Sequence, residues 1–360
     1  LYQCRLAGYS INVSINDGKI YLDIEGYSDK IIAVCEFIVN AMLHKNIDKN
    51  SFNSVKFMME TSNKSNAHRN PYIKVNDIFR EKAILKYYTY EQKLKVIEKT
   101  TQNDLDNLNN NIFSRSFVQS IITGNININD AMKIVKIIEL FVPSYIYRPI
   151  YAERDLVKKM ISEQKSIIKK AETEYETNVA VGCYVELTRL KLGSTHNWNK
   201  ILCIINMLEH MISDRYFDCL RSQEEFGYVV KGSTYVVGDP YFSTYYYKFL
   251  VQSPTKTPNE IITRTKLFIN DFVDCIKKMS DVIIKQYTEG CITKLLCPIP
   301  NLGELTNHYF SQIERGYYDF NIIDVLVETH KQITKRDILE FYVEKFVTNP
   351  IFLSVGFDRT

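Results

Sequence analysis

The sequence of 360 residues is long enough for two domains of ordinary size, each able to bury a hydrophobic core. Its 45 basic and 42 acidic side chains leave a net charge of +3, which gives no reason to expect nucleic acid or an anionic membrane as a partner. No apolar run reaches the roughly 18 residues of a membrane-spanning helix, so we expect no membrane span.

The first part of the sequence predicts a hairpin followed mainly by helices. Apolar and polar residues alternate on both sides of Asp17-Gly18, a dipeptide typical of tight hairpin turns. Residues 116–126, SFVQSIITGNI, predict a strand that ends at a Gly-Asn pair. Apolar side chains at helical spacing predict helices over residues 31–42, 50–113 and 129–141.

We place a domain boundary near residue 160, beyond Pro143 and Pro149, so the predicted domains are residues 1–160 and 161–360. In the second domain we expect strands over residues 164–172, 178–190, 226–253 (two strands and a turn) and 349–357, and helices over residues 198–212, 258–277, 279–295, 303–315 and 334–346. The predicted fold class is α+β, with two related domains that each pack an antiparallel sheet against helices.

Three sequences, each with a threonine followed three residues later by Gln or Asp, predict helix starts, where such pairs can satisfy free N–H groups as capping boxes. They are Thr89 with Gln92, Thr101 with Asp104 and Thr334 with Asp337. The aromatic run YFSTYYYKF, residues 241–249, could stack on nucleic-acid bases. We interpret it instead as a strand whose rings alternate between buried and exposed positions.

The eight cysteines are typical of free thiols, because none forms a C-x-x-C pair and several lie in apolar periodic segments. We therefore expect a reducing compartment and predict the cytoplasm. The sequence begins at Leu1 without a signal-peptide pattern. Because it opens within a predicted ordered element, we expect a fragment or a processed product.

The stretch LRSQEEFGYVV, residues 220–230, changes from a helical to a strand pattern. Arg221 lies on the helical side, and Tyr228 follows Gly227 on the strand side. Taken alone, these residues favour a structural interpretation: an ion pair between Arg221 and Glu225 and a tyrosine packed in the sheet.

Four segments of the sequence resemble the C-terminal half of the insulin-degrading enzyme and pitrilysin family of zinc peptidases, the inverzincins. They are LAGYSINVSINDGKIYLDIEGYSDK, ITGNININDAMKIVKIIE, NVAVGCYVEL and FDCLRSQEEFGYVV. The first two resemble parts of the family's third domain, and the last two resemble parts of its fourth. The last segment is similar to the family's R-x-x-x-x-L-G-Y sequence, with Phe226 in place of leucine.

The resemblance implies that this half closes with an N-terminal half around a peptide, and that the N-terminal half holds zinc through H-x-x-E-H and a distant glutamate. It implies catalytic roles for Tyr228, as a hydrogen-bond donor to the oxyanion, and for Arg221, which would hold a peptide carbonyl or orient the phenol. Phe217 would line the subsite just after the scissile bond, or lie in the core. Gly227 would permit the backbone turn between Arg221 and Tyr228.

None of the six histidines belongs to an H-x-x-E-H sequence. We therefore expect that this chain alone binds no Zn2+ and cleaves no peptide, and that its partners are an N-terminal catalytic half, in the same chain or a second one, and a peptide substrate. The alternatives are a non-catalytic peptidase-like subunit or peptide-binding partner, and an unrelated α+β interaction protein. The family's polyanion site is not implied, because the corresponding stretch, residues 291–305, holds only Lys294 as a basic residue.

Overall fold

The chain divides into two compact units that are interleaved along the sequence. The first comprises Leu1–Lys64, Tyr90–Arg154 and Ile299–Arg315, and the second comprises Ser65–Thr89, Asp155–Pro298 and Gly316–Thr360. The computed structural model describes residues 2–16, 19–44, 47–84, 87–113, 117–141, 165–171, 176–191, 198–239, 242–314 and 318–359. The predicted boundary near residue 160 lies outside the described residues, so the domain ranges 1–160 and 161–360 stay a prediction.

The first unit packs helices around a β-hairpin. Strands β1 (Ser10–Asn16) and β2 (Lys19–Glu25) pair antiparallel along their full lengths, as their alternating pattern predicted. A small core of Tyr9, Val34 and Ile38 lies beneath the hairpin. The described helices of this unit are α1 (Tyr2–Leu6), α2 (Ile31–His44), α3 (Lys49–Ser65), α5 (Tyr90–Lys99), α6 (Gln102–Ile112), α7 (Ile128–Ile138) and α11 (Leu302–Glu314).

The predicted strand over residues 116–126 is wrong in its described part. Residues 117–123 have no β pairing. This segment instead contacts α11, where the hydroxyl oxygens of Thr123 and Thr306 lie 2.5 Å apart. A strand needs a neighbouring strand to satisfy its backbone groups, and side-chain contacts with a helix do not supply one.

The second unit is built on a five-stranded sheet with the order β3-β7-β4-β6-β5. Its strands are β3 (Lys165–Lys170), β4 (Val179–Lys191), β5 (Val229–Asp239), β6 (Phe242–Ser253) and β7 (Phe352–Asp358). All neighbours pair antiparallel except β3 and β7, which form a parallel pair at the edge. Sheets packed against helices confirm the predicted α+β class.

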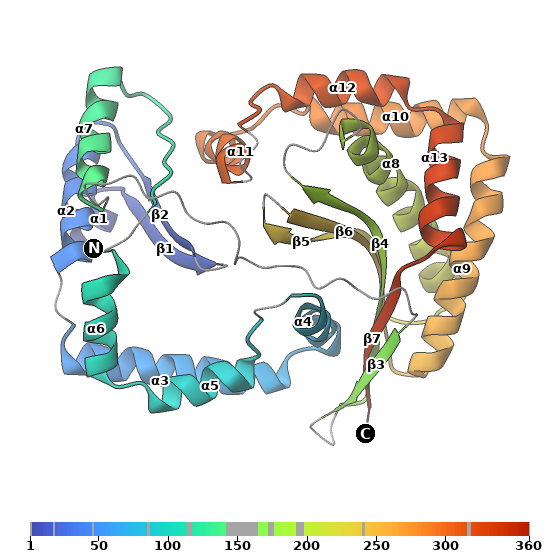
Figure 1. Cartoon of the computed structure of the whole chain (residues 1–360), viewed down its shortest axis with the longest axis horizontal. Coiled ribbons are helices and arrows are strands. Elements are labelled where there is room, and N and C mark those ends of the chain that lie inside the picture. The colour runs from blue at the N-terminus through green and yellow to red at the C-terminus, as the bar shows by residue number, and fades with distance from the viewer. Residues whose placement is uncertain are drawn as a thin grey trace. The chain divides into compact units, whose positions relative to one another are not determined.

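Helices cover both faces of this sheet (Figure 1). Val181, Cys183 and Val185 of β4 face a large core shared with α8, α9 and α13, whereas Ala180 and Tyr184 face a second core formed with α4. The described helices of the unit are α4 (Pro71–Ala83), α8 (Trp198–Phe217), α9 (Pro258–Lys278), α10 (Asp281–Leu295), α12 (Ile322–Gln332) and α13 (Lys335–Tyr342). Of these, α12 had no predicted counterpart. No described helix of either unit is long and apolar enough to cross a bilayer.

The aromatic run of β6 is a strand, but the predicted alternation of buried and exposed rings is wrong. Tyr245, Tyr246 and Tyr247 are all buried. The Tyr246 ring lies edge-on to Phe79 of α4, with centroids 5.1 Å apart, and the Tyr245 ring packs on the opposite face against Trp198 at 5.5 Å. Alternation toward solvent requires one open face, and here both faces of the sheet are covered.

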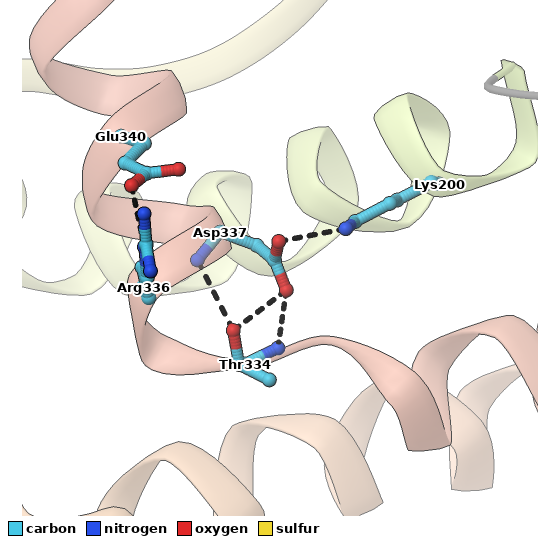
Figure 2. Close-up of polar contacts among 5 residues, drawn as sticks. All are labelled: Lys200, Thr334, Arg336, Asp337 and Glu340. Atoms are coloured by element: carbon cyan, nitrogen blue, oxygen red, sulfur yellow. Dashed lines mark hydrogen bonds and ion pairs between the residues drawn. The ribbon is translucent and has the colours of Figure 1, made fainter.

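Two of the three predicted helix caps are confirmed as capping boxes, at Thr101 and Thr334. The hydroxyl of Thr101 accepts a hydrogen bond from the backbone N–H of Asp104 at the start of α6, and Thr334 does the same with Asp337 at the start of α13. Figure 2 shows that the Asp337 carboxylate also accepts a hydrogen bond from Lys200 Nζ of α8 at 2.7 Å. Although partial burial opposes ionisation, the hydrogen bonds from Lys200 and Thr334 lower the pKa of Asp337 to about 2.

His330 of α12 lies in the interior of the second unit. Its side chain is fully buried, and neither ring nitrogen has a hydrogen-bond partner among the described residues. Burial alone lowers its pKa, because the charged form would lose its hydration. The ordinary pKa of about 6.5 applies in the unfolded chain. The folded state therefore favours neutral His330, and this contribution to stability is lost as the pH falls below about 6.5.

We expect the free energy of unfolding to decrease between pH 7 and pH 5, and His330→Leu to remove part of that decrease, because leucine cannot take up a proton. Denaturant unfolding across this pH range measures the effect. Val327→Leu, at a buried position of the same helix, is the control, because it involves no titratable group and should keep the pH dependence of the parent. An identical pH dependence in His330→Leu and the parent would contradict the prediction.

Candidate functional site

Residues 217–229 form a helix-to-strand corner in the second unit, where α8 ends and β5 begins. After Phe217 the helix widens into a π-helical turn, Asp218–Gln223. The wide turn closes with a hydrogen bond of 3.0 Å from the backbone N–H of Glu224 to the carbonyl of Cys219. Such turns recur at functional sites, because the added residue changes the direction in which neighbouring side chains project.

The corner backbone is fixed by packing on both sides. Leu220 is fully buried in the large core. We predicted that Gly227 permits the turn, but the residue in the left-handed region is Glu225, with φ of 49°. Gly227 is needed for a different reason: a Cβ atom there would lie 2.1 Å from the carbonyl oxygen of Gln252 on β6. Glycine thus allows the corner to approach the sheet backbone closely.

This corner brings Arg221 and Tyr228 together. The guanidinium carbon of Arg221 lies 5.3 Å from the centroid of the Tyr228 ring, within the range of a cation–π interaction. Arg221 is half-buried, whereas 78% of Tyr228 is exposed. The tyrosine is therefore not packed in the sheet, and Arg221 and Glu225, which are both described, form no ion pair. The local structural interpretation of this stretch is wrong because the π-helical turn and Glu225 replace α-helical i,i+4 spacing.

Phe217 lies four residues before Arg221 in the sequence, and its side chain lines a pocket. Its side chain is 47% exposed, so Phe217 is not a core residue. The pocket has a volume of about 460 Å³ and lies between α8, β5 and α10. Its lining is mixed in charge and polarity: Ser213, Asp214, Arg215, Phe217, Asp218, Val230, Lys231 and Tyr287. An aromatic wall with charged groups around it can accept a side chain of an extended peptide.

Arg264 of α9 holds the two ends of the π-helical turn. Its Nε lies 2.7 Å from Glu224 Oε2, its Nη2 lies 2.5 Å from Glu224 Oε1, and Nη2 also lies 3.0 Å from Cys219 Sγ. The hydrogen bonds from Arg264 lower the pKa of Glu224. Burial raises the pKa of Cys219 to about 11, so the thiol is protonated and donates to Glu224 Oε1 at 3.2 Å. The sequence interpretation missed both Arg264 and Glu224.

The chemistry available at the corner is hydrogen-bond donation. Tyr228 offers a phenol O–H to solvent, and Arg221 offers a fixed positive charge beside it. Among the residues with described positions, no three His, Cys, Asp or Glu side chains lie close enough together to hold a metal ion. The corner can therefore bind and stabilise a carbonyl or an oxyanion.

We expect Gly227→Ala to destabilise the chain by about 1–3 kcal/mol, because the new methyl group would clash with the β6 backbone. Gly290→Ala on α10 is the matched control, since its methyl group would meet nothing within 4 Å. That change should stabilise the chain by about 0.5–1 kcal/mol through helix propensity. Chemical denaturation of both variants measures the difference, and equal stabilities would contradict the close approach.

Two family models match parts of the chain. Residues 1–96 match the model for the middle or third domain of peptidase M16, and residues 207–310, which include the corner, match the model for domain 4 of the C-terminal lobe of PqqF-like PQQ synthase. The chain is 23% identical to a nardilysin-like protein of Arabidopsis thaliana, covering 96% of the chain and 33% of that protein. It is 24% identical to the peroxisomal insulin-degrading enzyme-like 1 of the same plant, covering 95% and 35%.

The fold also matches a solved structure, that of pitrilysin, with a TM-score of 0.79 and 16% identity over 99% of this chain and 36% of that one. The chain thus spans about a third of the length of the curated relatives it matches. The matched models are a third domain followed by a fourth, in the order of the chain. Over nearly its whole length the chain is thus similar to the C-terminal half of metallopeptidases of the insulin-degrading enzyme and pitrilysin family.

Proposed function

We propose that this chain is the substrate-binding half of a zinc metalloendopeptidase that hydrolyses peptides in a closed chamber. The observation that carries the proposal is the exposed Tyr228 hydroxyl beside the Arg221 guanidinium, on a corner fixed by the sheet. An N-terminal half, in the same chain or a second one, holds the zinc and the general base. The eight free thiols support a reducing compartment such as the cytoplasm.

The donor groups of this chain do not suit a zinc site, because its six histidines lack the H-x-x-E-H spacing and its described residues form no cluster of three ligands. We therefore assign the metal to the other half. When bound there, zinc supplies Lewis-acid activation of water and of the peptide carbonyl. The contribution of this chain is the binding and charge stabilisation that its own side chains provide.

Tyr228 acts on the charge that develops during peptide hydrolysis. Attack on the peptide carbonyl places negative charge on its oxygen, and a phenol O–H already aimed at that position donates a hydrogen bond without reorganisation. Arg221, beside the ring, helps to orient the phenol and adds positive charge. Phe217 and its pocket receive the side chain that follows the scissile bond.

In the protein that carries both halves, we expect Tyr228→Phe to lower kcat by about 100–1000-fold, the usual effect of removing one oxyanion donor. KM should change much less, because the lost hydrogen bond strengthens in the transition state. Arg221→Lys should also impair turnover, because an ammonium group cannot reproduce the planar fork. Steady-state kinetics on a fluorogenic peptide, with thermal unfolding as a check on folding, measures these effects.

Tyr2→Phe is the matched control for Tyr228→Phe, because Tyr2 is exposed to a similar extent, 75% against 78%. It should keep the parental kcat. Turnover by Tyr228→Phe within about twofold of the parent, with unchanged melting, would refute the catalytic role and leave Tyr228 as a surface residue.

The location of the metal can be tested without kinetics. We expect elemental analysis to find no stoichiometric zinc in the purified chain, and about one zinc per molecule in a protein that also carries an N-terminal half with H-x-x-E-H and a distant glutamate. The isolated chain should not cleave the peptide that the two-half protein cleaves. One zinc per isolated chain would contradict the assignment, and an upstream half with altered ligands would favour a non-catalytic, peptide-binding subunit.

A further inference from the structure

The direction in which the side chains of Arg221 and Tyr228 point depends on the π-helical turn and the residues that follow it. Backbone hydrogen bonds alone do not hold this turn in shape. The π-helical turn ends at Gln223, and Glu225 then adopts a left-handed conformation, which costs a residue with a Cβ atom about 1 kcal/mol or more. A hydrogen bond of 2.7 Å from the Phe226 backbone N–H to the carbonyl of Leu220 closes the corner from within. A strained turn of this kind persists only where its surroundings hold it.

The structure that holds the turn is helix α9, which contacts it through Arg264. Its guanidinium binds the Glu224 carboxylate through two nitrogens, and one of these also contacts the sulfur of Cys219. Cys219 is the second residue of the π-helical turn, and Glu224 is the residue that follows its end. One side chain from a separate helix therefore joins the two ends of the segment that carries Arg221. Glu224 is also the residue directly before Glu225, so the contact with Arg264 restrains the neighbour of the left-handed residue.

This arrangement differs from an ordinary surface ion pair. Arg336 and Glu340 of α13 pair through a single contact, and their side chains are 84% and 62% exposed. In contrast, the side chains of Arg264 and Glu224 are 20% and 30% exposed, and they bind with two-pronged geometry. Planar, two-pronged pairs fix the relative orientation of the two groups as well as their distance.

We propose that Arg264 is a positioning residue for the proposed peptidase reaction: by clamping Cys219 and Glu224 it fixes the corner from which Arg221 and Tyr228 reach the substrate. The contacts of Arg264 with Cys219 and Glu224 are called the clamp. The inference rests on the proposed function, because the clamp affects turnover only if Tyr228 and Arg221 act on the peptide. Arg264 itself touches neither the substrate nor the metal. Its effect passes entirely through the shape of the turn.

The clamp is tested in the protein that carries both halves, with Arg264→Lys, Arg264→Gln and Glu224→Gln. Arg264→Lys keeps the charge and loses the fork, so it should retain part of the activity that Arg264→Gln loses. Because small misplacements of reacting groups are costly, Arg264→Gln should lower kcat by about 10–100-fold with little change in KM. The double variant Arg264→Gln/Glu224→Gln should be no worse than either single variant, since both remove the same contact.

Amide hydrogen exchange supplies the readout that separates positioning from a general loss of stability. In Arg264→Gln, the amides of residues 224–228 should exchange faster, while those of residues 203–212 in the middle of α8 should be unchanged. Arg189→Gln is the matched control, because Arg189 binds Glu186 on β4 with the same two-pronged geometry, at 2.6 and 2.8 Å. It should leave both the exchange of residues 224–228 and kcat at parental values.

The outcomes distinguish the clamp from the proposed function. If Tyr228→Phe lowers kcat but Arg264→Gln changes neither kcat nor exchange at residues 224–228, the clamp is wrong and the proposed function stands. A fall in kcat without faster exchange would also overturn positioning. If exchange rises in Arg264→Gln while both Arg264→Gln and Tyr228→Phe turn over peptide normally, the proposed function fails and the clamp has no catalytic role.

Discussion

The close contact between Gly227 and the β6 backbone at Gln252 is the constraint on which the candidate site depends. No side chain with a Cβ atom fits at that point, because the carbonyl oxygen of Gln252 would lie 2.1 Å away. Once Gly227 is held there, β5 begins at Val229 and its register with β6 is set. Tyr228 then occupies the one position between the contact and the strand, where its ring projects into solvent. The pairing of β5 with β6 thus fixes the position of the Tyr228 phenol.

The sheet can act as a fixed reference because it is covered on both faces. The large core with α8, α9 and α13 holds one face, and the stacked rings of Phe79 and Tyr184, with centroids 3.7 Å apart, hold the other against α4. Cores packed to this extent resist continuous deformation. A site on such elements keeps its geometry better than one on a loop. The π-helical turn and the residues after it form an irregular step between α8 and β5, and Arg264 of α9 contacts this step.

Local patterns predicted local structure well, and pairing between distant segments was predicted poorly. The hairpin and the capping boxes at Thr101 and Thr334 depend on residues within a few positions of each other, and they are confirmed. The strand expected over residues 116–126 failed for lack of a pairing partner, and the solvent-facing rings expected on β6 are covered by α4, which is more than 150 residues away in sequence. At the site, only the family resemblance implied that Arg221 and Tyr228 act together, because the residues taken alone favoured an Arg221–Glu225 ion pair. The resemblance could not predict Arg264, which lies 40 residues beyond Glu224.

The energies involved explain why such distant support is required. An exposed cation–π contact is worth about 0.5–1 kcal/mol, which is less than the entropy of fixing two mobile side chains. The 5.3 Å contact between Arg221 and Tyr228 therefore cannot by itself hold a phenol where an oxyanion will form. Oxyanion stabilisation is large only when the donor is already in place. The backbone of the corner must therefore hold the Tyr228 phenol in position. The glycine contact fixes the strand side of that backbone, and the Arg264–Glu224 pair fixes the helical side.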